Sequence, residues 1–167
     1  MNEENTLTNY DEYEQWNELA IDSITYKQRT LEDWAEELII PEVCSNNLEE
    51  IELANYRAIK NTEVVGKHLS LSKATFLLSK ASYQNKLNKE KNIIVEEIES
   101  SSTKRLPSQE NLERMALNKS QKEWRVMLKS EIIYEFWQTQ SYKLNQIHTR
   151  LTSLNIIKNI ESKQMVV

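Results

Sequence analysis

Glycine and proline are nearly missing from this chain of 167 residues, in which glycine occurs once and proline twice. Sheet proteins need both residues to close their many turns, because glycine adopts backbone conformations that other residues avoid and proline fixes the turn geometry. A fold built from many short strands is therefore excluded. Few connections imply few and long elements, and we expect an all-α fold.

Cysteine, histidine and long apolar runs are also scarce. The single cysteine, Cys44, cannot form an internal disulfide, and neither His68 nor His148 lies at zinc-motif spacing from it. No window approaches the roughly 18 consecutive apolar residues that a membrane span requires. We therefore expect a protein without metal, cofactor or membrane segment, located in a reducing cytoplasm (the host's, if the protein is viral).

Catalytic motifs are missing as well. The sequence contains no glycine-rich phosphate loop, no Gly-x-Ser-x-Gly, no His-Glu-x-x-His and no Cys-x-x-Cys. Adjacent carboxylates such as Glu36 and Glu37, or Glu96 and Glu97, point apart on a helix and are typical of a solvated face. We predict that the protein is not an enzyme, with a metal-dependent nuclease as the enzymatic alternative.

The remaining pattern divides the chain into three regions. Residues 1–29 are acidic and weakly patterned and predict a partly disordered arm, whose first nine residues we expect to be disordered. Thr30 starts a capping box and Pro41 ends the following apolar pattern, so residues 30–63 predict short amphipathic helices, the first of them acidic. Residues 64–162 predict a long antiparallel, coiled-coil-like helical hairpin, with its turn near 100–107 in a stretch rich in serine and threonine.

The first arm of this hairpin has a candidate core face. Apolar residues recur at steps of three and four between residues 67 and 99, a run without glycine or proline. Such spacing places side chains on one side of a helix. The face comprises Leu71, Ala74, Leu77 or Leu78, Ala81, Leu87, Ile94 and Ile98.

The second arm could run from about Pro107 to Ser162, unless the weaker helix formers at 118–120 or 152–153 break it. Its C-terminal part has apolar residues at heptad spacing. Because this arm is longer than the first, its surplus length needs a partner. A neighbouring subunit is the simplest one, so we expect a homo-oligomer. The predicted core or oligomer seam comprises Ile133, Trp137, Leu144, Ile147, Leu151 and Leu154.

Charge is distributed unevenly along the chain. Residues 1–65 contain 16 Asp and Glu against 4 Lys and Arg, whereas residues 66–167 contain 10 against 17. An acidic first part followed by a basic part suggests a polyanionic partner for the latter. Mutual neutralisation of the two parts, within or between subunits, is the alternative.

Basic residues follow one side of the second arm, at steps of three, three and four from Lys119 to Lys129. Together with basic residues on the first arm and in the turn, they predict a cationic track that neutralises phosphates without reading sequence. A solvated helix face is the alternative interpretation. The candidate nucleic-acid-binding residues are Lys73, Lys80, Lys86, Lys91, Lys104, Arg105, Lys119, Lys122, Arg125 and Lys129.

Proteins that bind single strands usually add aromatic rings on which bases stack. Four aromatic residues of the hairpin are available for this role, although aromatic residues at helical spacing are more often part of a core. They are Tyr83, Tyr134, Trp137 and Tyr142.

Residues 31–38 (LEDWAEEL) form a short acidic amphipathic segment, and a lysine-rich helical stretch follows at 67–98. The segments 146–150 (QIHTR) and 157–161 (IKNIE) lie near the end of the second arm. In this organisation, residues 31–162 resemble the UvsY-type recombination mediator proteins of tailed bacteriophages. The two last segments are the most specific part of the resemblance.

The resemblance implies a protein of DNA recombination and repair that binds single-stranded DNA and assembles as a homo-oligomer. Proteins of this family help a RecA-like recombinase to replace the single-strand binding protein, and this role needs no active site. The resemblance implies that Lys80 and the basic residues from Lys119 to Lys129 contact phosphates. The acidic arm could contact a protein partner or cover the track.

Two non-enzymatic alternatives remain open. A coiled-coil adaptor or assembly protein would have the same helices, but charge reversal between Lys119 and Lys129 would leave its function intact. An inhibitor whose acidic arm imitates DNA would depend on residues 1–65, and truncation of these residues would abolish its activity.

Overall fold

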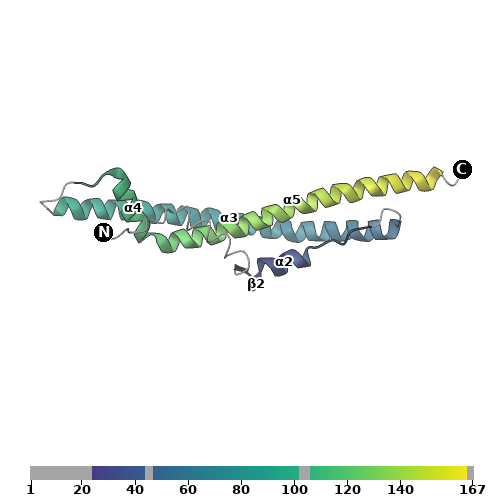
Figure 1. Cartoon of the computed structure of the whole chain (residues 1–167), viewed down its shortest axis with the longest axis horizontal. Coiled ribbons are helices and arrows are strands. Elements are labelled where there is room, and N and C mark those ends of the chain that lie inside the picture. Colours follow the sequence, from purple (N-terminus) through teal and green to yellow (C-terminus); the bar gives the residue numbers. More distant parts are fainter. Residues whose placement is uncertain (1–23, 44–46, 102–105, 165–167) are drawn as a thin grey trace, which may run out of the picture. The chain divides into compact units, whose positions relative to one another are not determined.

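The computed structural model describes residues 24–43, 47–101 and 106–164, and helices account for 86% of this part. Figure 1 shows two long helices as the dominant elements of the chain. The predicted all-α fold with a long helical hairpin is thereby confirmed. Residues 1–23 of the predicted acidic arm lie outside the described residues. The elements are β1 (Thr25–Tyr26), β2 (Arg29–Thr30), α2 (Leu31–Glu37), α3 (Leu48–Ser100), α4 (Gln109–Lys119) and α5 (Gln121–Gln164).

The chain forms two compact units, and α3 and α5 each contribute to both. We name the first the terminal unit, which comprises the residues up to 67 and those from 136 onward. The second, the middle unit, comprises residues 68–135. None of the helices in the described part of the chain has the length and apolar character needed to cross a membrane.

A tight two-stranded hairpin precedes α2. Thr25 pairs with Thr30 and Tyr26 with Arg29, and the two residues between the strands, Lys27 and Gln28, have φ values of 51° and 66°. Two-residue hairpin turns favour positive φ because their backbone twist then matches that of the strands. The sequence did not predict this turn, since it lacks the usual asparagine and glycine.

The capping box predicted at Thr30 is present. The Thr30 hydroxyl accepts a hydrogen bond from the backbone N–H of Asp33 at 3.0 Å, and the Asp33 carboxylate accepts one from the Thr30 N–H at 2.9 Å. These bonds hold the pKa of Asp33 below its ordinary value, because they favour the ionised form. Two donors that a helix start would otherwise leave unpaired are thus satisfied.

The boundary predicted at residue 64 is wrong, because α3 is one uninterrupted helix from Leu48 to Ser100. The side chain of Asn47 accepts hydrogen bonds from the N–H groups of Glu49 at 3.1 Å and Glu50 at 3.4 Å, which fixes the start of the helix. Gly66 lies in its interior without ending it, since a glycine there costs only about 1 kcal/mol relative to alanine. Of the short helices expected in residues 30–63, the first is α2, and the remainder is the first part of α3.

The second arm is broken at Ser120, one of the two positions where the sequence left a break open. Ser120 is fully buried between α4 and α5, and its backbone N–H donates to the Leu117 carbonyl at 3.0 Å. Pro107 precedes α4 instead of lying in its first turn, because Ser108 is the N-cap and accepts from the Asn111 N–H. The continuous second helix expected from Pro107 to Ser162 is thus two helices.

The core of the terminal unit is aromatic at one level and aliphatic at another. Trp137 is completely buried, with its ring centroid 5.4 Å from that of Trp34, 5.6 Å from that of Tyr26 and 5.1 Å from that of Phe136. Further along α5, Leu151 packs against two alanines of α3. That aliphatic cluster comprises Ala54, Ala58 and Leu151, with Ile40, Val43 and Ile147 packed against it.

The predicted seam of α5 is thereby a core within one chain. Trp137, Leu144 and Leu151 are buried, and Ile133, Ile147 and Leu154 are half-buried. The first part of α3 covers the surplus length of the second arm, as the packing of Leu151 shows. The surplus length on which the expectation of an oligomer rested is thus covered as far as Leu151, whereas Ile156, Ile157 and Ile160 beyond it are exposed. Oligomerisation itself stays a prediction.

In the middle unit, α3 and α5 run antiparallel with polar contacts between them. The hydroxyls of Ser79 and Ser130 hydrogen-bond to each other, and the rings of Phe76 and Tyr134 are stacked with centroids 5.8 Å apart. Small side chains at the first contact let the two helices approach closely.

Candidate nucleic-acid interface

Eight of the ten predicted DNA-binding residues lie in the described part of the chain. Lys104 and Arg105 lie outside the described residues. The other eight belong to the middle unit and fall into three groups that differ in what surrounds their charges.

The first group consists of Lys86, Lys91 and Lys119, whose charges are paired with carboxylates of the same chain. The Nζ of Lys86 lies 2.6 Å from the carboxylate of Glu90, and that of Lys91 lies 2.9 Å from the carboxylate of Glu113. The Nζ of Lys119 lies 3.9 Å from a carboxylate oxygen of Glu90 and 3.8 Å from one of Glu97. These three cations therefore have carboxylate partners within the chain, and their ion pairs link α4 to α3 or lie within α3 itself.

These ion pairs shift the acidities of their members. The hydrogen bond and charge of Glu90 raise the pKa of Lys86, and the same bond holds the pKa of Glu90 below its ordinary value. Lys91 likewise lowers the pKa of Glu113. Both directions favour the charged forms, so the pairs stay ionised at neutral pH.

The second group, Lys73 and Lys80, is exposed on α3, and Lys80 lies near acids of α5. The Nζ of Lys80 lies 5.6 Å from the ring centroid of Phe76, and its charge acts on Glu131 of α5. Burial, and secondly the charge of Glu135, raise the pKa of Glu131, whereas the charge of Lys80 lowers it; the net effect is a raised pKa. A polyanion approaching Lys80 would therefore meet carboxylates as well.

The third group is Lys122, Arg125 and Lys129 on α5, which we name the cationic face. All three are exposed, and none forms an ion pair with an acid in the described ranges. At 100° per residue they occupy a sector of roughly 60° on the helix. The nearby acids of α5, Glu123, Glu131 and Glu135, lie on its other sides by the same geometry.

A shallow groove adjoins the cationic face. It has a volume of about 430 Å³ and lies between α3 and α5. Val126 and Leu78 are its apolar members and are 57% and 73% exposed. The groove is lined by Thr75, Leu78, Ser79, Ser82, Lys122, Glu123 and Val126.

The aromatic residues expected to stack on bases are mostly occupied. Trp137 is buried in the terminal unit and Tyr134 is stacked on Phe76. Burial raises the pKa of Tyr83, which is half-buried. Only Tyr142, at 65% exposure, offers its ring to solvent among these four, and it belongs to the terminal unit.

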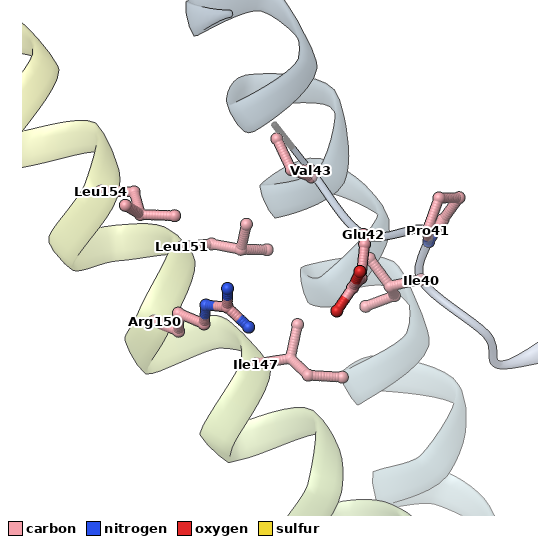
Figure 2. Close-up of a pocket in the computed structure, with 8 residues that line it drawn as sticks. All are labelled: Ile40, Pro41, Glu42, Val43, Ile147, Arg150, Leu151 and Leu154. Carbon is pink, nitrogen blue, oxygen red and sulfur yellow. The ribbon is translucent and has the colours of Figure 1, made fainter. Parts of the chain in front are cut away.

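A pocket of about 250 Å³ in the terminal unit includes part of the segment 146–150. Figure 2 shows Ile147, Arg150, Leu151 and Leu154 on α5 facing the irregular segment after α2. The opposite wall consists of Ile40, Pro41, Glu42 and Val43. Since its walls are apolar apart from one guanidinium and one carboxylate, the pocket suits hydrophobic side chains better than phosphates.

The two histidines and the acids form no metal site among the residues that the structure describes. His148, which has no partner at diagnostic spacing in the sequence, contacts the Asn55 side chain with its Nδ1 at 2.9 Å from Oδ1. This contact joins α5 to the first part of α3 and gives His148 a structural role. Cys44 lies outside the described residues.

One surface was missed because the sequence pattern was assigned to the wrong side of the helix. Leu71, Leu78, Ala74 and Ala81, predicted as core, are exposed in the structure. Further along the predicted face the prediction holds better, since Ile94 is buried and Leu87 and Ile98 are half-buried. The buried side of α3 that was not predicted includes His68, Ser72 and Glu90. Serine, histidine and glutamate gave no hydrophobic signal, so periodicity alone could not identify this side.

The chain matches no protein-family model, and no curated protein or solved structure is significantly similar to it.

Proposed function

We propose that this chain binds the phosphate backbone of single-stranded DNA through the cationic face of α5. We propose further that it acts as a non-enzymatic recombination mediator, which helps a RecA-like recombinase to replace a single-strand binding protein. The observation that supports the binding step is the exposed set of Lys122, Arg125 and Lys129, with no ion-pair partner in the described residues. The resemblance to UvsY-type proteins supports the mediator role.

The geometry favours contacts to the backbone over contacts to bases. The three cations span about 10 Å along the helix axis, since each residue advances 1.5 Å. Tyr134 is stacked on Phe76, and Trp137 is buried. Backbone contacts read no sequence, so binding should be independent of sequence and strongly dependent on salt.

The test is a titration of a fluorescently labelled single-stranded oligonucleotide with the purified chain, followed by fluorescence anisotropy at several salt concentrations. Neutralisation of three phosphates predicts that log K falls with log salt with a slope of about −2 per chain. The variant Lys122→Glu/Arg125→Glu/Lys129→Glu should lose this slope and bind at least about tenfold more weakly.

A matched variant controls for net charge. Arg57→Glu/Lys60→Glu/Lys67→Glu changes one arginine and two lysines at exposed positions of α3 outside the middle unit. If both triple variants weaken binding equally, the cationic face is not the site. Absence of binding by the folded wild-type chain at low salt would overturn the proposal.

A second candidate function is that of a coiled-coil adaptor without a nucleic-acid partner. The observation that favours it is the exposure of Leu71, Leu77 and Leu78 on α3, which gives a helical surface suited to a protein. In this case the cationic-face variant would retain full activity, whereas a charge introduced at Leu78 would abolish it.

A further inference from the structure

One part of the exposed side of α3 in the middle unit is apolar and uncharged between residues 70 and 84. Leu71, Leu77 and Leu78 are 46%, 53% and 73% exposed, and Ala74 and Ala81 are exposed between them. The two lysines of this stretch, Lys73 and Lys80, point at least about 100° away from the centre of this surface at 100° per residue. We name this surface the leucine–alanine stripe.

Its spacing is that of a coiled-coil seam. Leu71 and Leu78 are seven residues apart, and so are Ala74 and Ala81, with a step of three from each leucine to the next alanine. Steps of three and four that repeat every seven residues are the a and d positions of a heptad. Its residues are exposed, so no helix of the described ranges covers this seam, and an exposed apolar surface of this kind suits an interaction partner.

We propose that the leucine–alanine stripe pairs with the same stripe of a second copy of this chain, with the two α3 helices antiparallel. In an antiparallel pair centred on Phe76, a residue of one copy lies level with the residue of the other copy whose number, added to its own, gives 152. Leu71 then lies level with Ala81 of the other copy, and Ala74 with Leu78. This pairing stands on the stripe alone and does not depend on DNA binding.

The size of the side chains favours this arrangement over a parallel one. Antiparallel pairing places a large residue opposite a small one at all four levels of the stripe, which fills the interface evenly. Parallel pairing would place leucine against leucine and alanine against alanine, and the alanine levels would be underpacked. Leu77 likewise comes level with Thr75 of the other copy, again large against small.

The distribution of charge favours a second copy over a different protein. A two-fold interface brings the same surface of both copies together, so a charged residue on it would lie close to residues of the same charge. The stripe and its flanking positions Ser70, Thr75, Ser82 and Gln84 contain no charge. A dissimilar partner is usually selected by complementary charge, for which this surface offers nothing.

The pairing has a consequence for the groove beside the stripe. Leu78 and Ser82 line that groove together with Val126 of α5, so Leu71 of the other copy would lie next to it. A two-fold axis perpendicular to the paired helices leaves both α5 helices on one side of the pair. The two cationic faces would then share one surface, and this last consequence alone rests on the proposed function.

Sedimentation equilibrium without DNA tests the pairing. The wild-type chain should have twice its chain mass of 19.7 kDa at micromolar concentration. Leu78→Glu should raise the dissociation constant at least about a hundredfold, because a symmetric interface loses the leucine twice. Met115→Glu, at another exposed apolar position of the middle unit, should leave it unchanged. A monomeric wild-type chain would overturn the proposal, as would dimers that Leu78→Glu does not weaken.

Disulfide trapping tests the direction, in a Cys44→Ser background. The variants Leu71→Cys and Ala81→Cys should form a cross-linked dimer under mild oxidation only when they are mixed, since each introduced thiol is level with the other. Leu71→Cys that cross-links rapidly on its own would indicate parallel helices and overturn the antiparallel pairing. Circular dichroism of each variant, compared with the wild type, establishes that it is folded.

Discussion

The terminal unit and the middle unit use the same two long helices but bury different side chains. Among the described residues, ten of the fourteen buried apolar side chains belong to the terminal unit, whereas all five buried polar or charged ones belong to the middle unit. Trp137 and Leu151 represent the first kind of packing, and Ser130 and Glu90 the second.

The difference separates a part that stabilises the chain from a part suited to binding. Burial of large apolar side chains provides the main favourable free energy of folding, and the terminal unit has most of it. In the middle unit, α3 and α5 meet through serines, so leucines and cations remain on the surface. Both the cationic face and the leucine–alanine stripe lie there.

The largest expected effect comes from removing the centre of the aromatic core. Trp137→Ala should lower the free energy of unfolding by about 3–5 kcal/mol, because it removes a fully buried indole and leaves a cavity. Urea denaturation followed by circular dichroism measures this change. Tyr142→Ala on the same helix, 65% exposed, should change the stability by less than about 0.5 kcal/mol. Equal losses for both variants would contradict the assignment of the core.

A smaller effect is expected at the serine contact of the middle unit. Ser130→Ala should cost about 0.5–1.5 kcal/mol, because it removes the bond to Ser79 and leaves that hydroxyl with fewer partners. The double variant Ser79→Ala/Ser130→Ala should cost no more than the single one, since no hydroxyl then remains unpaired at this contact. A double-mutant cycle from urea denaturation measures the coupling. Additive losses would show that the two hydroxyls do not act together.

The smallest effect concerns pH and the ion pairs between α3 and α4. The pKa of Glu90 is lowered in the folded chain, so its contribution to stability is present above the ordinary glutamate pKa and is lost as the pH falls through the folded value. Thermal unfolding between pH 6 and pH 3 should therefore show a shallower decline for Glu90→Gln than for the wild type. Parallel curves for the two proteins would contradict a role of this carboxylate in the acid response.

Features set by local chemistry could be predicted from the sequence. The helical class followed from the near absence of glycine and proline, and the cap at Thr30 followed from hydroxyl and carboxylate side chains three residues apart. Trp137, Leu144 and Leu151 were recognised as a buried seam, because their spacing is independent of what covers them.

Features that depend on a second helix could not be predicted. Lys119 belonged to a convincing basic stripe, but Glu90 and Glu97 of α3 lie within 3.9 Å of it once α4 packs there. The break at Ser120 was one of two possibilities, the other being residues 152–153. Ser120 is completely buried, whereas residues 152–153 are exposed within α5. The length of α3 was underestimated because the long apolar pattern is clear only from about residue 64, whereas the helix begins at Leu48.

The sequence by itself determined that the chain is helical, that Thr30 caps the first helix and which part of α5 is buried, because these depend on local side-chain chemistry, backbone propensity and the spacing of apolar residues along one helix. Only the tertiary structure decided which side of α3 faces α5 and which lysines remain free of carboxylates. Both depend on contacts between residues far apart in the chain. The spacing of Leu71 and Leu78 fits a core face, but α3 contacts α5 through Ser79 and Ser130, and both leucines are exposed.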